Sequence, residues 1–296
     1  MIDFRQMRYF IALFEEGAVT RAARKLNIVQ PALSMQISKL EQQIGQKLFE
    51  RTSDGMVPTE PAKHMYRLLR PLLSDFEQVD RAIRRQNSSG GGHLKVGIVP
   101  SIAYGMLPDV IRRFEIECPN VSLSIEDGYS DGLIERARIG RIDLALVNLP
   151  KDHAGLIVEP ILAQELVLIS SVHQFAKIPS KINFERISEL KLVLPSKRHG
   201  LRSLIDDIAT SKGIRIVPKF EIDILPVIAD LVQRSDAVSL LPPIAVRNHL
   251  TSEPGLRQHR IVSPRLSATL GWVHQTRRPI TGVGRKFIKA FGTNIF

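Results

Sequence analysis

A short run of amide and hydroxyl side chains near the N-terminus has the chemistry needed to recognise DNA bases. Its members are Gln30, Ser34, Met35, Gln36 and Ser38, followed by Lys39. Amides and hydroxyls complement the donors and acceptors that base pairs present in the major groove, and a thioether can contact the methyl group of thymine. These residue types therefore favour a base-contacting surface over one that is merely solvated.

The apolar residues between them predict the helix that carries this surface. Leu33, Ile37, Leu40 and Ile44 recur at helical spacing, so one face of the helix is buried and the other is free. Pro31 suits the first helical position, because its missing N–H costs nothing there. A shorter helix before it and a turn at residues 27–29 complete the layout of a helix-turn-helix. Spacing alone leaves open a small helical hairpin without a DNA role.

The residue pattern of this segment is more specific than its spacing. It runs Thr20-x-Ala22-Ala23-x-x-Leu26-x-x-x-Gln30-Pro31-Ala32-Leu33-Ser34-x-x-Ile37-x-x-Leu40-Glu41, then Gly45-x-x-Leu48-Phe49-x-Arg51-Thr52 and Pro58-Thr59. This pattern resembles the signature of LysR-type transcriptional regulators. The resemblance implies that the DNA-facing residues are Gln30, Pro31, Ser34 and Met35. We expect Gln36 and Ser38 to contact phosphates, and Lys39 either to join them or to remain a solvated charge.

Residues 48–58 predict two short strands around a glycine turn, which would form the wing of a winged helix-turn-helix domain. The resemblance implies that Arg51 contacts the DNA backbone; the alternative is a salt bridge from Arg51 to Glu50 or Glu41. The wing tip carries Asp54, which would repel phosphate. The cap positions of the two motif helices hold Ala18 and Val29, which lack the capping hydroxyl common in the family.

A long helix is expected from Thr59 to residue 87. Its apolar seam comprises Ala62, Tyr66, Leu69, Leu73, Phe76 and Ile83. So narrow a seam favours pairing with a second copy as a coiled coil, as a reader of two-fold DNA sites requires. The alternative is that the seam packs on the chain's own body. Pro71 should kink the helix near Arg67.

Residues 93–296 alternate short apolar strands with amphipathic helices, which predicts an α/β body. Two similar halves joined by crossovers near 162–163 and 264–265 resemble a periplasmic-binding-protein fold. The expected chain therefore has a winged helix-turn-helix domain at 1–58, a linker helix at 59–87 and a flexible linker at 88–92. An effector-binding body follows, with subdomain I at 93–161 and 268–296 and subdomain II at 162–267.

Ligands of such sheets bind beyond the carboxyl ends of the strands, near helix N-termini. The candidate effector-binding residues there are Ser101, Ile102, Tyr129, Ser130, Ser196, Lys197, Arg198 and Arg202. The basic cluster at 197–202 favours a carboxylate or other anionic effector. Ser101 could instead serve only as a helix cap. His199 is expected to be a solvated loop residue rather than a metal ligand, since no second His or Cys lies at ligand spacing.

Composition bounds the possible partners. The net charge of +11 favours polyanions, and after Glu253 the chain has eight cationic residues and no acidic one. This basic segment is either a solvated face or a contact with bent DNA. No apolar run approaches a membrane span, and charges interrupt residues 1–17, so neither a membrane partner nor a signal peptide is expected. The single cysteine, Cys118, excludes an internal disulfide and fits a reducing cytoplasm.

The leading hypothesis is a sequence-specific DNA-binding regulator that forms homodimers or homotetramers. Its expected partners are double-stranded DNA, a small-molecule effector and, from the resemblance, RNA polymerase. No cofactor or metal is expected. An enzyme on the α/β body is a second hypothesis, but no G-x-S-x-G elbow, P-loop, Rossmann glycine pattern or H-E-x-x-H motif is present. A solute-binding protein is the third, and it would leave the N-terminal motif without a purpose.

Overall fold

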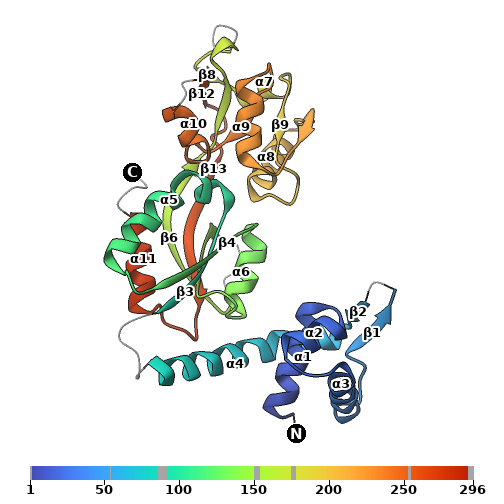
Figure 1. Ribbon diagram of the computed structural model, residues 1–296. Helices are drawn as coiled ribbons and strands as arrows, with labels where there is room; N and C mark the ends of the chain where they lie inside the picture. Colours follow the sequence, from blue (N-terminus) through green and yellow to red (C-terminus); the bar gives the residue numbers. More distant parts are fainter. Residues whose placement is uncertain are drawn as a thin grey trace. The chain divides into compact units, whose positions relative to one another are not determined.

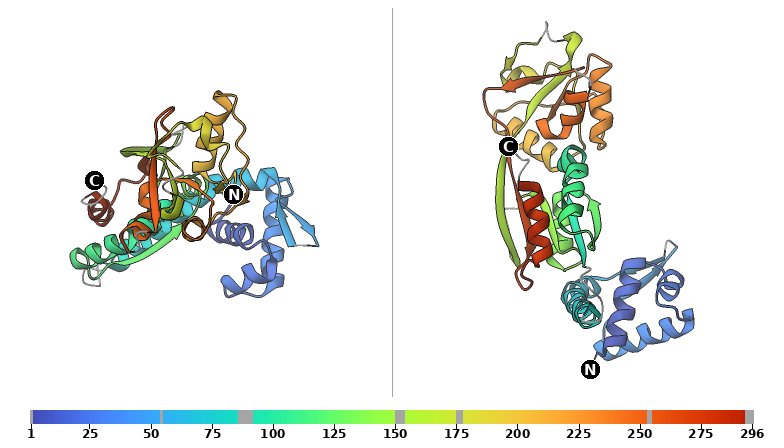
Figure 2. Two further views of the ribbon diagram at one scale, coloured as in Figure 1. Left: turned by 90° about the horizontal axis from the view of Figure 1, so that it is seen from above. Right: turned by 60° about the vertical axis from the view of Figure 1, so that its left-hand side comes forward.

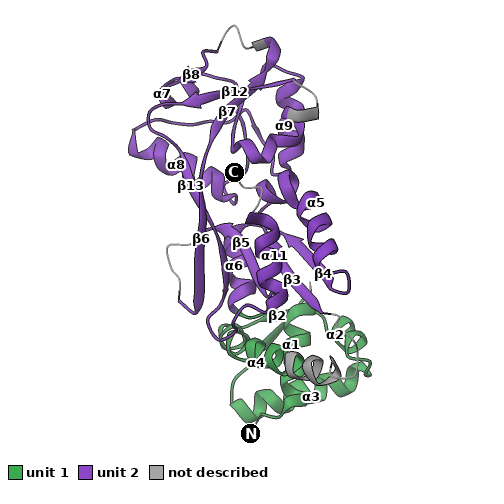
Figure 3. Ribbon diagram, turned by 90° about the vertical axis from the view of Figure 1, so that its left-hand side faces the viewer, with its two compact units in different colours: residues 1–89, 139–141 green, residues 90–138, 142–296 purple. Residues whose placement is uncertain are grey.

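The structure is a computed structural model that describes residues 2–53, 55–85, 92–149, 154–174, 178–252 and 255–292. The chain divides into two compact units, residues 1–89 with 139–141 and residues 90–138 with 142–296 (Figure 3). We call the described residues 2–85 the head, and the described residues of the second unit, within 92–138 and 142–292, the body.

Four helices and a hairpin form the head (Figure 1). They are α1 (Phe4–Glu16), α2 (Val19–Lys25), α3 (Gln30–Ile44), β1 (Phe49–Thr52), β2 (Gly55–Pro58) and α4 (Glu60–Arg85). Asp3 and Gln6 start α1 with reciprocal capping hydrogen bonds, and Gly17 ends it with φ +61°. Residues between α2 and α3 turn the chain through Asn27, whose φ of 55° suits asparagine. The helix-turn-helix is thus present, and Pro31 is the second residue of α3.

Packing of the hairpin fixes the wing against the helices. Strands β1 and β2 are antiparallel, with Arg51 opposite Met56. The amide of Met56 donates to the carbonyl of Gly17 at 2.8 Å. Gly55 has φ +130°, and a Cβ atom there would lie 2.5 Å from the Gly17 carbonyl oxygen. Glycine at this position therefore allows the close approach that seats the wing.

Most of the expected pairing seam of α4 packs within the head. Ala62, Tyr66 and Leu73 are buried in the head core, and the Tyr66 ring stacks on Phe14 at 4.0 Å between centroids. The prediction that these residues pair with a second copy is therefore wrong, because α1 supplies aromatic partners for them. Leu69 also packs on this core, and the side chain of Ile83 lies outside the described residues. Helix α4 continues through Pro71.

The first subdomain of the body is a five-stranded sheet of order β4-β3-β5-β13-β6. Its strands are β3 (His93–Ile98), β4 (Ser122–Asp127), β5 (Leu144–Asn148), β6 (Leu156–Glu165) and β13 (Ser267–Gln275). Three helices pack against this sheet (Figure 2): α5 (Pro100–Glu117), α6 (Ser130–Arg138) and α11 (Gly282–Gly292). Strands β3, β4 and β5 are parallel, as the alternation predicts, and β13 returns from the second subdomain to pair with β5 and β6.

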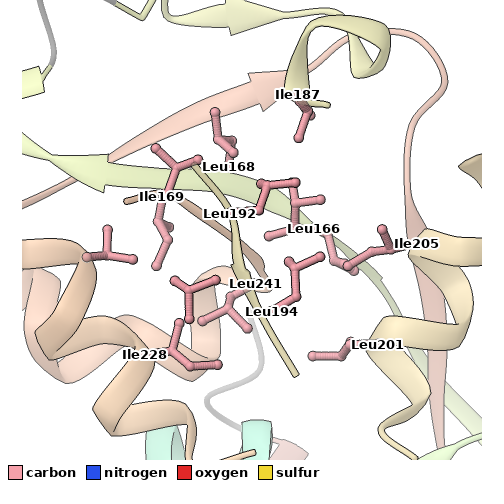
Figure 4. Close-up of a cluster of buried hydrophobic side chains, with 14 of the residues drawn as sticks. Leu166, Leu168, Ile169, Ile187, Leu192, Leu194, Leu201, Ile205, Ile228 and Leu241 are labelled. Atoms are coloured by element: carbon pink, nitrogen blue, oxygen red, sulfur yellow. The ribbon is translucent and has the colours of Figure 1, made fainter. Parts of the chain in front are cut away.

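The second subdomain has the sheet order β11-β7-β12-β8 and a parallel pair β9-β10. Its strands are β7 (Val167–Ser171), β8 (Lys181–Ile182), β9 (Val193–Leu194), β10 (Phe220–Glu221), β11 (Ser239–Leu241) and β12 (Leu256–Ile261). Its helices are α7 (Phe184–Ile187), α8 (Gly200–Ser211), α9 (Leu225–Gln233) and α10 (Arg247–Ser252). Its core is mainly aliphatic, with Phe184 as a buried aromatic member (Figure 4). Strand β6 continues to Glu165, so the first crossover falls at residue 166 rather than at 162–163.

One polar pair lies within this second core. His259 on β12 is fully buried, with Nε2 2.8 Å from the Ser170 hydroxyl and Nδ1 2.8 Å from the Pro179 carbonyl. A carbonyl oxygen can only accept, so Nδ1 carries the proton and Nε2 accepts from Ser170. Burial lowers the pKa of His259, an effect that the Pro179 carbonyl partly offsets. The ring is therefore neutral at physiological pH.

We expect this histidine to make the body less stable in mild acid. As the pH falls below about 6.5, the unfolded chain takes up a proton that the buried ring resists, so the free energy of unfolding declines by up to about 1.4 kcal/mol per pH unit. Urea unfolding of the whole chain between pH 8 and pH 5 measures this decline. His259→Gln should make this decline smaller. An equal decline in that variant would mean that other titratable groups cause it.

Candidate nucleic-acid interface and effector site

The exposed face of α3 carries the side chains that the sequence assigns to DNA. Gln30, Pro31, Met35, Ser38 and Lys39 are exposed, while Ser34 and Gln36 are half-buried. The opposite face, with Leu33, Ile37 and Leu40, is buried in the head core. Met35 is 63% exposed, and a large apolar side chain left in water at the centre of a polar face suits contact with a thymine methyl.

A hollow in the head brings the first turn of α3 together with the wing. Its lining includes Gln30 and Ser34 from α3 and Arg51 from β1. It also includes Thr20, Thr52 and Ser53, to which the sequence analysis assigned no DNA contact. Hydroxyl side chains can donate hydrogen bonds to phosphate oxygens. In the sequence, the sign of this role was the presence of hydroxyl residues directly after Arg51 and at the start of α2. A groove edge and an adjacent phosphate can thus be contacted from one concave surface.

The structure rejects the salt-bridge alternative for Arg51. Glu41, its expected competitor, is buried and accepts from Lys47 Nζ at 2.8 Å and from the amides of Leu48 and Phe49 at 2.9 and 3.2 Å. Burial raises the pKa of Glu41, but these three donors outweigh it and hold the pKa below its usual value. Arg51 is exposed and forms no ion pair with any described residue. Asp54, at the wing tip, lies outside the described residues.

A partly buried ionic network joins α4 to the helices that carry the interface. Glu15 on α1 accepts from the Tyr66 hydroxyl at 3.0 Å, from Arg70 Nε at 3.2 Å and from Lys25 Nζ at 3.2 Å. Burial, together with the Glu15 carboxylate, raises the pKa of Tyr66 to about 12. Burial alone would raise the pKa of Glu15, but Arg70 and Lys25 have the larger combined effect, so this pKa lies below its usual value. Because α1, α2 and α4 share this carboxylate, the linker helix is oriented relative to the helix-turn-helix.

In the body, a carboxylate links the two subdomains at the carboxyl ends of their strands. Tyr129, which follows β4, donates its hydroxyl to Asp223 Oδ2 at 2.8 Å. Ser196, which follows β9, donates its amide to Oδ1 at 2.8 Å and its hydroxyl to Oδ2 at 3.0 Å. Partial burial raises the pKa of Asp223, and these donors lower it below its usual value. Asp223 is a residue of this region that sequence reasoning missed.

Two buried polar atoms of this region have no partner among the described residues. His199 is 3% exposed, which corrects the expectation that it is solvated. Its Nδ1 accepts from the Leu201 amide at 3.3 Å and so caps α8; Nε2 then carries the proton and is unsatisfied, as is Asn148 Oδ1 at the end of β5. Burial lowers the pKa of His199, with Asp223 opposing it. A neutral donor and a neutral acceptor therefore lie near the ends of the strands.

Three of the expected effector contacts differ from the sequence analysis. Arg202 is 3% exposed and binds Asp206 and Glu221, each at 2.9 Å, so its charge is already neutralised. Ile102 is 2% exposed within the core of the first subdomain, where it cannot contact a ligand. Ser101 is 2% exposed, so its hydroxyl is not open to a ligand; it is the second residue of α5, where Val99 holds the cap position, so it is no helix cap either. Ser130 is half-buried, and Lys197 and Arg198 are exposed.

Comparison with protein families decides the identity of this architecture. The family model "Bacterial regulatory helix-turn-helix protein, lysR family" matches residues 4–63, and "LysR substrate binding domain" matches residues 87–294. The chain belongs to the LysR family. It is a LysR-type transcriptional regulator with a helix-turn-helix domain and an effector-binding domain.

LysR-type relatives match this regulator along nearly its whole length. The nitrogen assimilation regulatory protein nac of Klebsiella aerogenes is 25% identical over 91% of this chain and 87% of its own. The hydrogen peroxide-inducible genes activator of Haemophilus influenzae is 25% identical over 94% of this chain and 92% of its own. Among solved structures, a full-length single-residue variant of OxyR from Pseudomonas aeruginosa has a TM-score of 0.77 at 20% identity, covering 99% of this chain and 98% of that one. CbnR in complex with its target DNA has a TM-score of 0.66 at 21% identity, with 98% of each chain covered.

Two further properties of the described residues concern membranes and metals. No helix in that part of the chain has the length and apolarity to cross a membrane. The same residues contain no cluster of three or more His, Cys, Asp or Glu side chains arranged to hold a metal ion.

Proposed function

We propose that this regulator binds double-stranded DNA sequence-specifically through the exposed face of α3, with the wing holding the adjacent backbone. The observation that carries the proposal is the shared hollow into which Gln30, Ser34 and Arg51 converge. Gln30 and Met35 supply base contacts, Arg51, Gln36 and Ser38 supply phosphate contacts, and Lys39 adds charge.

Two substitutions separate these roles. Gln30→Ala should narrow the affinity difference between the cognate site and a scrambled duplex, because an amide–base contact contributes about 1–3 kcal/mol of discrimination. Arg51→Ala should weaken binding to both duplexes equally and lower the slope of log K against log salt by about one. Fluorescence anisotropy titrations at several salt concentrations measure both quantities. Unchanged discrimination in Gln30→Ala would remove the base-contacting role.

Dimerisation through α4 is part of the proposal, on a face that shares only Phe76 with the seam that the sequence favoured. Leu68, Leu72 and Phe76 are 59%, 52% and 53% exposed and recur every four residues along one side of the helix. Exposed apolar stripes of this kind bury themselves against a second copy. A symmetric pair of heads would then match a two-fold DNA site.

We further propose a small-molecule effector at the carboxyl ends of the body's strands. Tyr129, Ser130 and Ser196 are the candidate contacts, and the unsatisfied His199 and Asn148 atoms support a ligand with both an acceptor and a donor. An anionic effector would have Lys197 and Arg198 for charge but not Arg202. It would also have to replace Asp223 as the acceptor of the hydrogen bonds from the Tyr129 and Ser196 hydroxyls.

Although one relative is named as a hydrogen peroxide-inducible genes activator, a thiol-based peroxide response does not fit this chain. Peroxide oxidises accessible thiolates, whereas Cys118 is buried and is the only cysteine of the chain. An internal disulfide cannot form.

A gel-shift titration with genomic fragments tests the regulator hypothesis against the two other hypotheses, an enzyme or a solute-binding protein. Only the regulator predicts a salt-dependent, fragment-specific complex.

A further inference from the structure

The outer face of α11 carries positive charge of a single sign. Among the residues of this helix, those exposed to solvent are Gly282, Arg285, Lys286, Lys289 and Gly292, so every exposed side chain beyond glycine is a cation. The adjacent turn between β13 and α11 adds Arg277, which is also exposed. We call Arg277, Arg285, Lys286 and Lys289 the α11 basic face.

Neighbouring surfaces of the body do not share this pattern. The exposed face of α5 mixes Arg112 with Glu115 and Glu117, and Arg138 on α6 pairs with Glu135 at 2.8 Å. By contrast, no member of the α11 basic face forms an ion pair with another described residue. Unpaired charges of one sign repel one another even when exposed, so their grouping on one helix face favours an anionic partner.

The scaffold beneath the face is rigid. Phe287 and Phe291 on the inner side of α11 are fully buried and pack edge-on against Phe114 and Trp272, with centroids 5.3 Å apart in each of the pairs Phe114–Phe287 and Trp272–Phe291. The cations are therefore presented from a fixed helix rather than from a loose tail. Guanidinium and ammonium groups held in this way bind phosphate oxygens with charge-assisted hydrogen bonds.

We propose that the α11 basic face is a second DNA contact, which binds phosphates of the duplex flanking the site held by the heads. The proposal rests on the function proposed above, since a body tethered to a DNA-bound head meets flanking DNA at high local concentration. Its partner is the sugar-phosphate backbone, so the contact adds affinity and salt dependence without adding sequence preference.

The test compares two triple variants on two duplexes. Arg285→Gln/Lys286→Gln/Lys289→Gln removes three charges from the basic face. Lys212→Gln/Arg215→Gln/Lys219→Gln is the matched control, because these three cations are exposed on the second subdomain and have no ion pair there among the described residues. The duplexes are the shortest one that the wild-type chain binds specifically and the same site extended by flanking sequence on both sides.

On the extended duplex, the α11 variant should bind at least about tenfold more weakly at low salt, with a salt slope smaller by up to about 2.7, which is 0.9 for each lost contact. On the short duplex it should match the wild type, and the control variant should match it on both. Equal losses in the two variants, or no loss in either, would overturn the proposal. Unchanged DNA binding with reduced transcription by RNA polymerase would assign the face to a protein partner and overturn it too. Failure of the wild type to bind the short duplex specifically would instead refute the proposed function.

Discussion

Replacing Leu68 and Leu72 together by alanine is expected to convert the protein to monomers and to lower its affinity for a full two-fold DNA site by at least about a hundredfold. Linking two heads makes the second binding event intramolecular, which raises overall affinity by about 10²–10⁴. Both leucines are more than half exposed on α4, so alanine removes apolar area from the proposed pairing face and disturbs little of the head core. Alanine also preserves the helix.

Lys63→Ala/Arg67→Ala provides the matched control on the same helix. Both residues are exposed but charged, so the control should remain dimeric while losing some non-specific affinity. Sedimentation equilibrium gives the oligomeric state, and titrations of a full site and of an isolated half-site give the affinities. A leucine variant that stays dimeric, or one that loses affinity equally for the half-site, would contradict the assigned pairing face.

Glu41→Ala is expected to destabilise the head by about 2–4 kcal/mol and to abolish specific DNA binding at physiological salt. The substitution leaves the buried amides of Leu48 and Phe49 without their acceptor and Lys47 without its partner. These amides begin β1, so the strand that presents Arg51 would lose its anchor to α3. Thermal unfolding and anisotropy titration measure the two effects.

Gln42→Ala separates this anchoring role from a general effect on α3. Gln42 is the adjacent, exposed residue, and alanine there should leave both stability and DNA binding close to wild type. Because the pKa of Glu41 is lowered in the folded head, its contribution to stability is complete above the ordinary glutamate pKa and is lost as the pH falls from there through the lower pKa of the folded state. Equal stability of Glu41→Ala and Gln42→Ala would show that the wing does not depend on this carboxylate.

The sequence predicted those parts of the protein that depend on local pattern. The buried face of α3, its polar face and the parallel strands of the first subdomain follow from spacing within single elements, and the structure has them in place. The two missing caps, Ala18 and Val29, likewise form no side-chain capping bond. Sequence periodicity did not predict strand β12. Its buried residues, Leu256, His259 and Ile261, are spaced irregularly, with neither strand nor helix periodicity.

Partners distant in sequence account for the errors. Arg202 looked like a free cation because Glu221 lies far along the chain from it, although its second partner, Asp206, is only one helical turn away. His199 looked solvated because nothing local covers it. The seam of α4 satisfied coiled-coil spacing, but spacing does not distinguish a second copy from α1 of the same head. Asp223, which accepts from Tyr129 and Ser196, is visible only once both subdomains are folded.

The most direct test of the account compares two duplexes of equal length and composition, one from the region upstream of the protein's own gene and one scrambled. Their affinities for the purified chain are measured by anisotropy across a range of salt concentrations. We expect the upstream duplex to bind about 10³-fold more tightly or better, with both affinities falling steeply as salt rises. Equal affinity for the two duplexes at every salt concentration would contradict the assignment of α3 as a base-contacting helix.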